Sequence, residues 1–165
     1  MKKVIYTLFS ILFLSTWANA QVTSSLIMNP NPPTVALDWL KEPQPIKLLV
    51  TNTSNSDLRG IRAVVDVKNV LTGAQVISST YQKGIPIDVP KMGTKMFFGT
   101  DLFNQNSFDV NTSQINLTSG SIKPGNYRIC IKLVTSQGVE VTQFACANFQ
   151  VTEFQEPILQ LQYHK

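Results

Sequence analysis

The segment GNYRICIKLVTSQGVEVTQFACANF, residues 125–149, has the alternating pattern of a β-hairpin and contains both cysteines of this 165-residue chain. Neighbouring side chains of a strand point to opposite faces of a sheet. In the first half, one face is apolar and consists of Tyr127, Ile129, Ile131 and Leu133. From residue 139 onward, the matching apolar face consists of Val139, Val141, Ala145, Ala147, Phe149 and Val151. The pattern predicts two antiparallel strands whose apolar face lies on a core, with Cys130 and Cys146 on the opposite face.

The first twenty residues differ in composition from the rest of the chain and are predicted to be a cleaved signal peptide. Lys2 and Lys3 precede an apolar run over residues 4–17, and the small-residue motif ANA follows at 18–20. A basic start, a short apolar region and a small-residue cleavage site are typical of exported proteins. We therefore expect a bacterial protein in the periplasm, on the outer cell surface or outside the cell, with no membrane span in the mature chain.

In an exported chain, Cys130 and Cys146 are predicted to form a structural disulfide. Two cysteines on one face of adjacent strands rarely remain free thiols in an oxidising compartment. A zinc site normally needs four ligands, and the only histidine of the chain, His164, lies in the tail. The sequence also lacks the C-x-x-C spacing of redox-active pairs. We expect no metal and no cofactor.

The loop of the hairpin allows two registers. If residues 136–138 form a three-residue loop, Gly138 takes the left-handed position that such loops favour, and Cys130 then faces Phe144. If the pairing shifts by two residues, Cys130 faces Cys146 directly, which is the natural geometry for a disulfide. We therefore expect that Gly138 and the disulfide cannot both have their preferred places.

The remainder of the chain after residue 22 also has a period of two. In 60–68, for example, Ile61, Ala63, Val65 and Val67 fall on one face and Arg62, Asp66 and Lys68 on the other. Turn-forming residues separate the candidate strands at short intervals, and these strands are 24–29, 45–53, 60–68, 74–82, 85–89, 94–98, 126–135 and 139–151. The pattern predicts an all-β protein: an immunoglobulin- or fibronectin-like antiparallel β-sandwich of seven or eight strands. We expect one domain over 21–155, followed by a tail or linker at 156–165.

Two segments do not follow this alternating strand pattern. Residues 29–45 contain five prolines, which confine them to a sheet edge or an irregular crossing, with Trp39 as an anchor in the core. Residues 99–121 form a long connection, and such connections are commonly functional or ordered by their own side chains. In this loop Phe103, Asn104 and Phe108 are candidate binding residues, although the two rings are favoured as a seal over the end of the sandwich.

The segment IKPGNYRICI places Pro124 and Gly125 ahead of Tyr127 at the start of a strand. It resembles the corner of immunoglobulin-like sandwiches, where a tyrosine hydroxyl bonds to nearby backbone. The segments VTNTSNSD, RAVVDVK and PGNYRICI are similar in layout to secreted bacterial modules of the CARDB kind. Together with MNPNP, the second cysteine and FQEPIL, they resemble the amino-terminal module of Bacteroidota surface proteins of the TANFOR type. The resemblance implies cell-surface display and interaction, and it implies no catalytic residues.

The sequence contains few of the groups that catalysis requires, and we predict that the protein is not an enzyme. The sequence has no nucleophile elbow, no H-E-x-x-H motif and no phosphate loop. Asp101 and Asp109 could pair as glycosidase carboxylates, but a solvated loop is the favoured interpretation. Without the signal peptide, twelve basic and ten acidic residues leave a net charge of +2 over 145 residues, which does not indicate nucleic-acid binding.

Three functional hypotheses follow from these features. The favoured one is an interaction module of the bacterial envelope, which docks a protein partner through the 99–121 loop or by strand addition at a sheet edge. The second is a carbohydrate-binding module that would stack sugar rings on Trp39, Tyr81 and Phe144. The third is a structural spacer or a subunit of a surface assembly.

Overall fold

The computed structural model describes residues 21–28, 46–104, 106–116 and 121–151. The predicted signal peptide, the proline-rich segment with Trp39, and the predicted tail lie outside these residues. The described chain is all-β with antiparallel sheets, as predicted. The described residues contain one short α-helix, α3 (Gly99–Leu102). No helix among them is long and apolar enough to cross a membrane.

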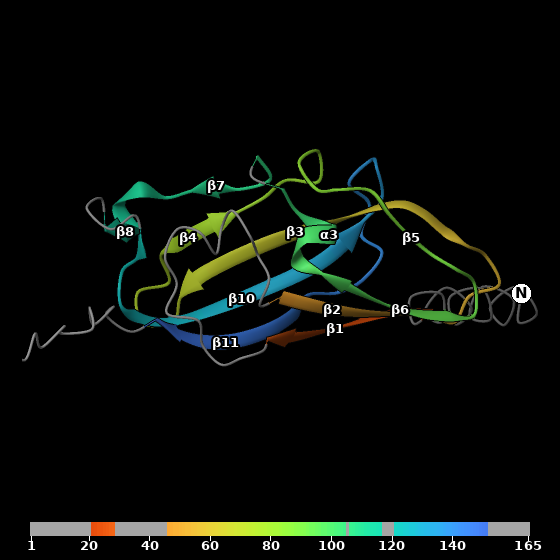
Figure 1. Ribbon diagram of the computed structural model, residues 1–165, viewed down its shortest axis with the longest axis horizontal. Coiled ribbons are helices and arrows are strands. Elements are labelled where there is room, and N and C mark those ends of the chain that lie inside the picture. The colour runs from red at the N-terminus through yellow and green to blue at the C-terminus, as the bar shows by residue number, and fades with distance from the viewer. Residues whose placement is uncertain (1–20, 29–45, 105, 117–120, 152–165) are drawn as a thin grey trace, which may run out of the picture.

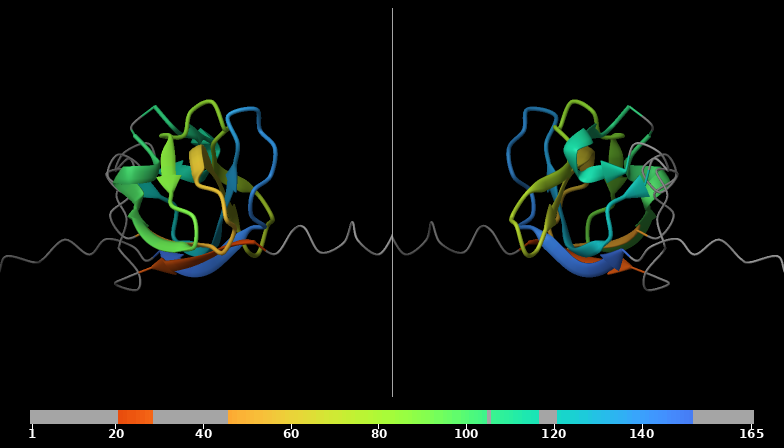
Figure 2. Two further views of the ribbon diagram at one scale, coloured as in Figure 1. Left: turned by 90° about the vertical axis from the view of Figure 1, so that its right-hand side faces the viewer. Right: turned by 90° about the vertical axis from the view of Figure 1, so that its left-hand side faces the viewer.

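Two main sheets lie on opposite sides of a common interior (Figures 1 and 2). The smaller sheet has the order β1-β2-β6, with bounds Val22–Met28, Ile46–Asn52 and Gly93–Phe98. The larger sheet has the order β11-β10-β3-β4-β7, with bounds Ala145–Val151, Gly125–Val134, Leu58–Asn69, Gln75–Ser78 and Asp109–Val110. Strand β5 (Ile87–Val89) pairs with the first part of β3. All these pairings are antiparallel.

The core is built mainly from the alternating inward-facing positions of the strands, and the apolar faces predicted for 60–68 and 126–135 belong to it. Val139, predicted on the apolar face of the last hairpin, is instead 63% exposed. Each fully buried large aliphatic side chain contributes roughly 1.5–3 kcal/mol relative to an exposed one. The smaller sheet contributes Ile46, Leu48, Val50 and Phe97, and the larger sheet contributes Ile61, Ala63, Val65, Val67, Tyr127, Ile129, Ile131, Leu133 and Phe149. Hydrophobic burial between the two sheets is therefore the main source of stability.

The edge strands β1 and β11 lie side by side where the two sheets meet (Figure 1). In β1, the inward-facing Val22, Leu26 and Met28 are only half-buried, although they pack against the core. In β2 the corresponding positions are fully buried. β1 is hydrogen-bonded to a neighbouring strand on one side only, and it is less enclosed than the strands inside the sheets.

The predicted long connection has short elements of its own. After α3 and β7 it forms a 3-10 helix over Thr112–Gln114 and a small hairpin of β8 (Ile115–Asn116) and β9 (Ser121–Ile122). Among its described apolar side chains, Leu102, Phe103 and Ile115 are buried in the core, and Phe108 and Val110 are half-buried against it. The loop is thus ordered largely by its own side chains.

Two predicted strands are too long. The candidate 74–82 ends at Ser78, because the hydroxyl of Ser79 then accepts a hydrogen bond from the backbone N–H of Val65 at 2.9 Å. The candidate 139–151 becomes a continuous strand only at Ala145. The preceding residues form an irregular stretch of the last hairpin.

Candidate functional site

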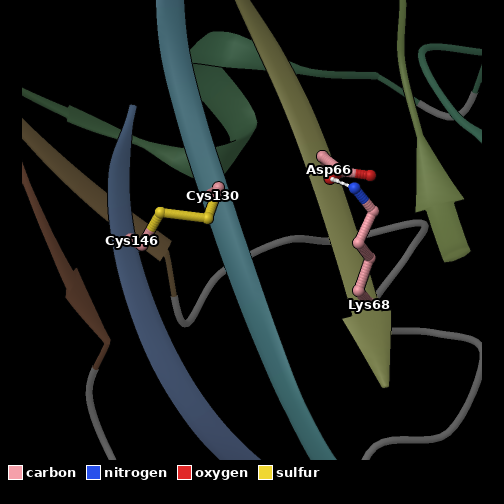
Figure 3. The surroundings of a disulfide bond; sticks show 4 residues. All are labelled: Asp66, Lys68, Cys130 and Cys146. Atoms are coloured by element: carbon pink, nitrogen blue, oxygen red, sulfur yellow. Dashed lines mark ion pairs between the residues drawn. A yellow bond between two sulfur atoms is a disulfide. The ribbon is translucent and has the colours of Figure 1, made fainter. Parts of the chain in front are cut away.

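The last hairpin contains a disulfide between Cys130 and Cys146, which confirms the predicted crosslink. The two cysteines are direct partners in the β10–β11 ladder, with their Cα atoms 4.1 Å apart. Both are half-buried. The bond lies on the outer face of the larger sheet, beside Asp66 and Lys68 of β3 (Figure 3). The bond joins the edge strand β11 to β10, which pairs with β3 on its other side.

The predicted conflict between Gly138 and the disulfide is wrong, because both keep their preferred places. Gly138 has φ of 83° and its N–H donates to the carbonyl of Thr135 at 3.0 Å. The N–H of Thr135 donates to the carbonyl of Val139 at 2.8 Å, so residues 136–138 form the three-residue loop. A side chain at Gly138 would be strained by this φ, and its Cβ would lie 3.0 Å from the ring of Tyr81.

A bulge with two extra residues reconciles the two registers. On β10, three steps lead from Ile131 to Val134, whereas five steps lead from Ala145 back to Glu140 on the other strand. The pairs Ile131–Ala145 and Val134–Glu140 therefore belong to registers that differ by two residues. Such a bulge bends its strand locally and leaves the pairing on either side intact.

The bulge is held by Thr142, whose side chain is buried. Its hydroxyl accepts a hydrogen bond from the N–H of Leu133 at 3.0 Å. The N–H groups of Val141 and Thr142 both donate to the carbonyl of Leu133, at 2.8 and 3.2 Å. The hydroxyl of Ser24 in β1 donates to the Thr142 hydroxyl at 3.3 Å. The bulge thus satisfies its own backbone groups and contacts the smaller sheet.

The corner residues Pro124, Gly125 and Tyr127 lie at the start of β10. The hydroxyl of Tyr127 donates to the carbonyl of Lys123 at 2.5 Å, and its buried ring stacks on Phe149 with centroids 5.6 Å apart. Burial raises the pKa of Tyr127, and a hydrogen bond with the side chain of Asn69 opposes this shift. Pro124 is exposed, and Gly125 is the first residue of the strand.

The candidate loop residues do not form a common exposed site. Phe103 is 2% exposed and its ring centroid lies 5.2 Å from that of the half-buried Phe108. The ring of Phe103 is therefore part of the core and offers no surface to a partner. Asn104 is exposed, and its side-chain carbonyl accepts hydrogen bonds from the N–H of Asn106 and the hydroxyl of Ser107. These bonds shape the turn.

The two loop carboxylates have separate structural contacts. Asp101 accepts a hydrogen bond from the N–H of Phe98 at 2.8 Å, at the start of α3. Asp109 forms an ion pair with Lys83. Each carboxylate fixes a different part of the loop.

Two of the three aromatic residues considered for sugar binding lie in the described part of the chain. Tyr81 is half-buried and lies against Gly138. Phe144 is 48% exposed, with the Nζ of Lys132 4.8 Å from its ring centroid. Trp39 lies outside the described residues.

The outer face of β1-β2-β6 carries an apolar patch that the sequence interpretation missed. We call it the β6 patch and define it as Ile27, Lys47, Leu49, Met96 and Phe98. Lys47 pairs with both Ile27 and Phe98, and Leu49 pairs with Met96, so the patch forms two adjacent rows across the sheet. Ile27, Met96 and Phe98 are 40%, 46% and 45% exposed. The alternation predicts that each of these side chains points outward, but only the register brings them together.

Comparisons with known proteins do not assign a family. No protein-family model and no curated protein matches the chain. One similar solved structure is the alkylpurine DNA glycosylase AlkC of Pseudomonas fluorescens bound to DNA, with a TM-score of 0.43 and 11% identity over 87% of this chain and 33% of that chain. Another is a β-glucosidase involved in saponin metabolism from intestinal bacteria, with a TM-score of 0.37 and 13% identity over 65% of this chain and 13% of that chain. This chain therefore spans a third or less of either protein, and the likeness carries no argument about function.

Proposed function

We propose that this chain is a non-catalytic interaction module of an exported bacterial envelope protein, with an immunoglobulin-like sandwich that docks a protein partner. The proposed site is the β6 patch, at the edge of the smaller sheet and next to the start of the 99–121 loop. The predicted signal peptide and the disulfide between Cys130 and Cys146 support an oxidising location in the periplasm, on the cell surface or outside the cell.

The observation that carries this proposal is the clustering of exposed apolar side chains in the β6 patch. Single exposed apolar residues are ordinary, whereas neighbouring ones on one face are typical of interaction sites. Phe98 and Met96 also belong to the residue types that are enriched at protein interfaces. The buried position of Phe103 makes the patch a better candidate than the loop itself.

Lys47 defines the chemistry of the partner. Strands β1, β2 and β6 contain no acidic residue, and among the described residues no carboxylate pairs with Lys47. Its Nζ lies 5.6 Å from the ring centroid of Phe98. A complementary partner therefore presents apolar side chains around a carboxylate. A second copy of this face would place one Lys47 near another, which disfavours self-association.

An inward-pointing lysine on the edge strand β6 disfavours the addition of a further strand to this edge. Lys95 is the ladder partner of the buried Val50 and so lies on the inner side of β6. Its Nζ is 4.9 Å from the ring centroid of Phe97. Inward-pointing charges on edge strands protect against edge-to-edge aggregation. The proposed partner therefore binds mainly through the side chains of the outer face.

Site-specific photo-crosslinking in the native host tests this proposal. A photoreactive phenylalanine analogue replaces Phe98 in one strain and the 82% exposed Leu71, which lies in a turn elsewhere, in a control strain. We expect one protein to crosslink from position 98 but not from position 71, and Lys47→Glu to abolish that product. Equal products from both positions, or a product that persists in the Lys47→Glu strain, would reject the β6 patch as the docking site.

A further inference from the structure

The outer face of the larger sheet carries a row of four exposed polar side chains from four adjacent strands. Asn148 of β11 pairs with Arg128 of β10, Arg128 pairs with Lys68 of β3, and Lys68 pairs with Gln75 of β4. All four residues are exposed. Neighbouring strands lie roughly 4.8 Å apart, so the row extends over about 14 Å. We call it the polar row.

The centre of the polar row brings two positive charges together. Like charges directly opposite each other on adjacent strands destabilise a sheet. Lys68 is compensated by Asp66, whose carboxylate lies 2.8 Å from its Nζ. The other oxygen of Asp66 accepts a hydrogen bond from the side-chain amide of Gln75 at 2.6 Å. Asp66 is thus engaged by Lys68 and Gln75.

Arg128 has no such compensation. Among the described residues, the structure records no ion pair and no side-chain hydrogen bond of its guanidinium. A guanidinium presents several donors in a planar fork, which matches the two oxygens of a carboxylate or sulfate group. The exposed, unpaired Arg128 beside Lys68 is therefore suited to an anionic group from outside the chain.

The disulfide fixes the geometry of the row. Cys130 lies two residues after Arg128 and Cys146 two residues before Asn148, so all four side chains are on the same face of the sheet. The crosslink therefore prevents the edge strand β11 from slipping relative to β10, and it keeps Asn148 beside Arg128. Preorganised binding groups lose less conformational entropy when a ligand binds.

We infer that the polar row binds an anionic polysaccharide. The carboxylate or sulfate group of one sugar unit accepts hydrogen bonds from Arg128, while Lys68 beside it is held by Asp66 and leaves the Arg128 charge as the one that the ligand neutralises. The side-chain amides of Asn148 and Gln75 can donate to or accept from sugar hydroxyls at the two ends of the row. One uncompensated cation, Arg128, in a row that ends in two neutral amides matches a chain of hydroxyls with spaced charges better than a nucleic acid, which bears a phosphate on every nucleotide.

Affinity electrophoresis of the exported protein with its disulfide intact tests this inference. The gels contain polygalacturonate as the carboxylate probe, dextran sulfate as the sulfate probe, neutral dextran, or single-stranded DNA. We expect retardation by one or both anionic polysaccharides, and the probe that retards the protein identifies the anionic group. Retardation by neutral dextran as strong as that by the anionic polysaccharides, retardation by DNA alone, or no retardation by either anionic polysaccharide would overturn the inference.

A matched pair of variants separates a site from general charge attraction. Arg128→Gln and Arg59→Gln each remove one exposed arginine, but Arg59 lies at the start of β3, where it pairs with Asp57. We expect Arg128→Gln to weaken binding at least tenfold and Arg59→Gln to weaken it less than twofold. Equal losses would show nonspecific attraction and overturn the inference.

A third variant, Lys47→Glu, tests whether this site is distinct from the β6 patch. We expect it to keep full polysaccharide binding, and loss of binding in this variant would also count against the polar row.

Discussion

Strands β10 and β1 have the same alternating pattern but different degrees of enclosure. β10 lies between β3 and β11, and its inward-facing Tyr127, Ile129, Ile131 and Leu133 are 0% exposed. β1 lies at a sheet edge, and its inward-facing Val22, Leu26 and Met28 remain half-buried. A period of two therefore indicates which side of a strand faces the core, whereas the position of the strand in its sheet determines how much each side chain contributes.

The largest difference between the two strands should appear in truncated core side chains. Ile129→Ala in β10 removes a fully buried side chain and should lower the free energy of unfolding by roughly 2–5 kcal/mol. Leu26→Ala in β1 should cost less than half as much, because Leu26 is already partly solvated. Urea denaturation, followed by far-ultraviolet circular dichroism, measures the free energy of unfolding of both variants. Equal losses would mean that β1 is as enclosed as β10.

The disulfide gives β10 a second advantage over β1. The Cys130→Ser/Cys146→Ser variant should lower the free energy of unfolding by at most about 3 kcal/mol, the chain-entropy value for a loop of roughly 15 residues. Denaturation of this variant and of the reduced wild-type protein measures the loss, and the two should agree. A variant as stable as the oxidised wild type would show that the hairpin stays paired in the unfolded chain.

The hydroxyl of Thr142 in the bulge links the two strands, because it accepts hydrogen bonds from Ser24 of β1 and Leu133 of β10. Loss of this hydroxyl should have an intermediate effect on the free energy of unfolding. Thr142→Val keeps the shape of the side chain but leaves the N–H of Leu133 without its acceptor, which should cost about 1–3 kcal/mol. The exposed Thr80 provides the control variant, Thr80→Val. Hydrogen exchange of the Leu133 amide should accelerate only in Thr142→Val, and unchanged exchange would contradict the assigned bond.

The smallest predicted effect concerns Asp57, which directly precedes β3 and belongs to neither strand. Hydrogen bonds from the N–H of Lys91 and the guanidinium of Arg59 hold the pKa of Asp57 below its ordinary value of 3.8. A lowered folded-state pKa contributes stability above the unfolded-state pKa, and this contribution is lost as the pH falls through the folded-state pKa. Asp57→Asn should therefore slightly flatten the loss of stability between pH 5 and pH 2 in acid denaturation, whereas a steeper loss would contradict this sign.

Much of the core could be predicted because alternation is a local property. The faces of residues 60–68 and 126–135 followed from side-chain period alone, and the disulfide followed from cysteines on one face of adjacent strands. The bulge could not be predicted, because Val139 and Val141 continue the apolar alternation while the hydroxyl of Thr142 replaces a backbone acceptor. A side chain that substitutes for a ladder bond leaves no trace in the hydrophobic pattern.

The two candidate surfaces depended on register between strands that are far apart in sequence. Arg128 and Lys68 are sixty residues apart and become neighbours only through the pairing of β10 with β3. Likewise, Met96 and Leu49 meet only through the pairing of β6 with β2. Phe103 and Phe108 are expected to seal the end of the sandwich because long loops are commonly ordered by their own side chains. The packed rings agree with that expectation, although a loop has no period from which the direction of each ring could be derived.

The two extra residues between Glu140 and Ala145 separate the tip of the last hairpin from the crosslinked ladder behind it. A change of loop length at residues 136–138 can be absorbed in this irregular stretch before it reaches Cys146. The tip is therefore a natural site for grafting a foreign peptide, such as an epitope tag or an affinity loop, onto the scaffold. The crosslinked strands would carry the insert without changing which residues face each other across the sheet.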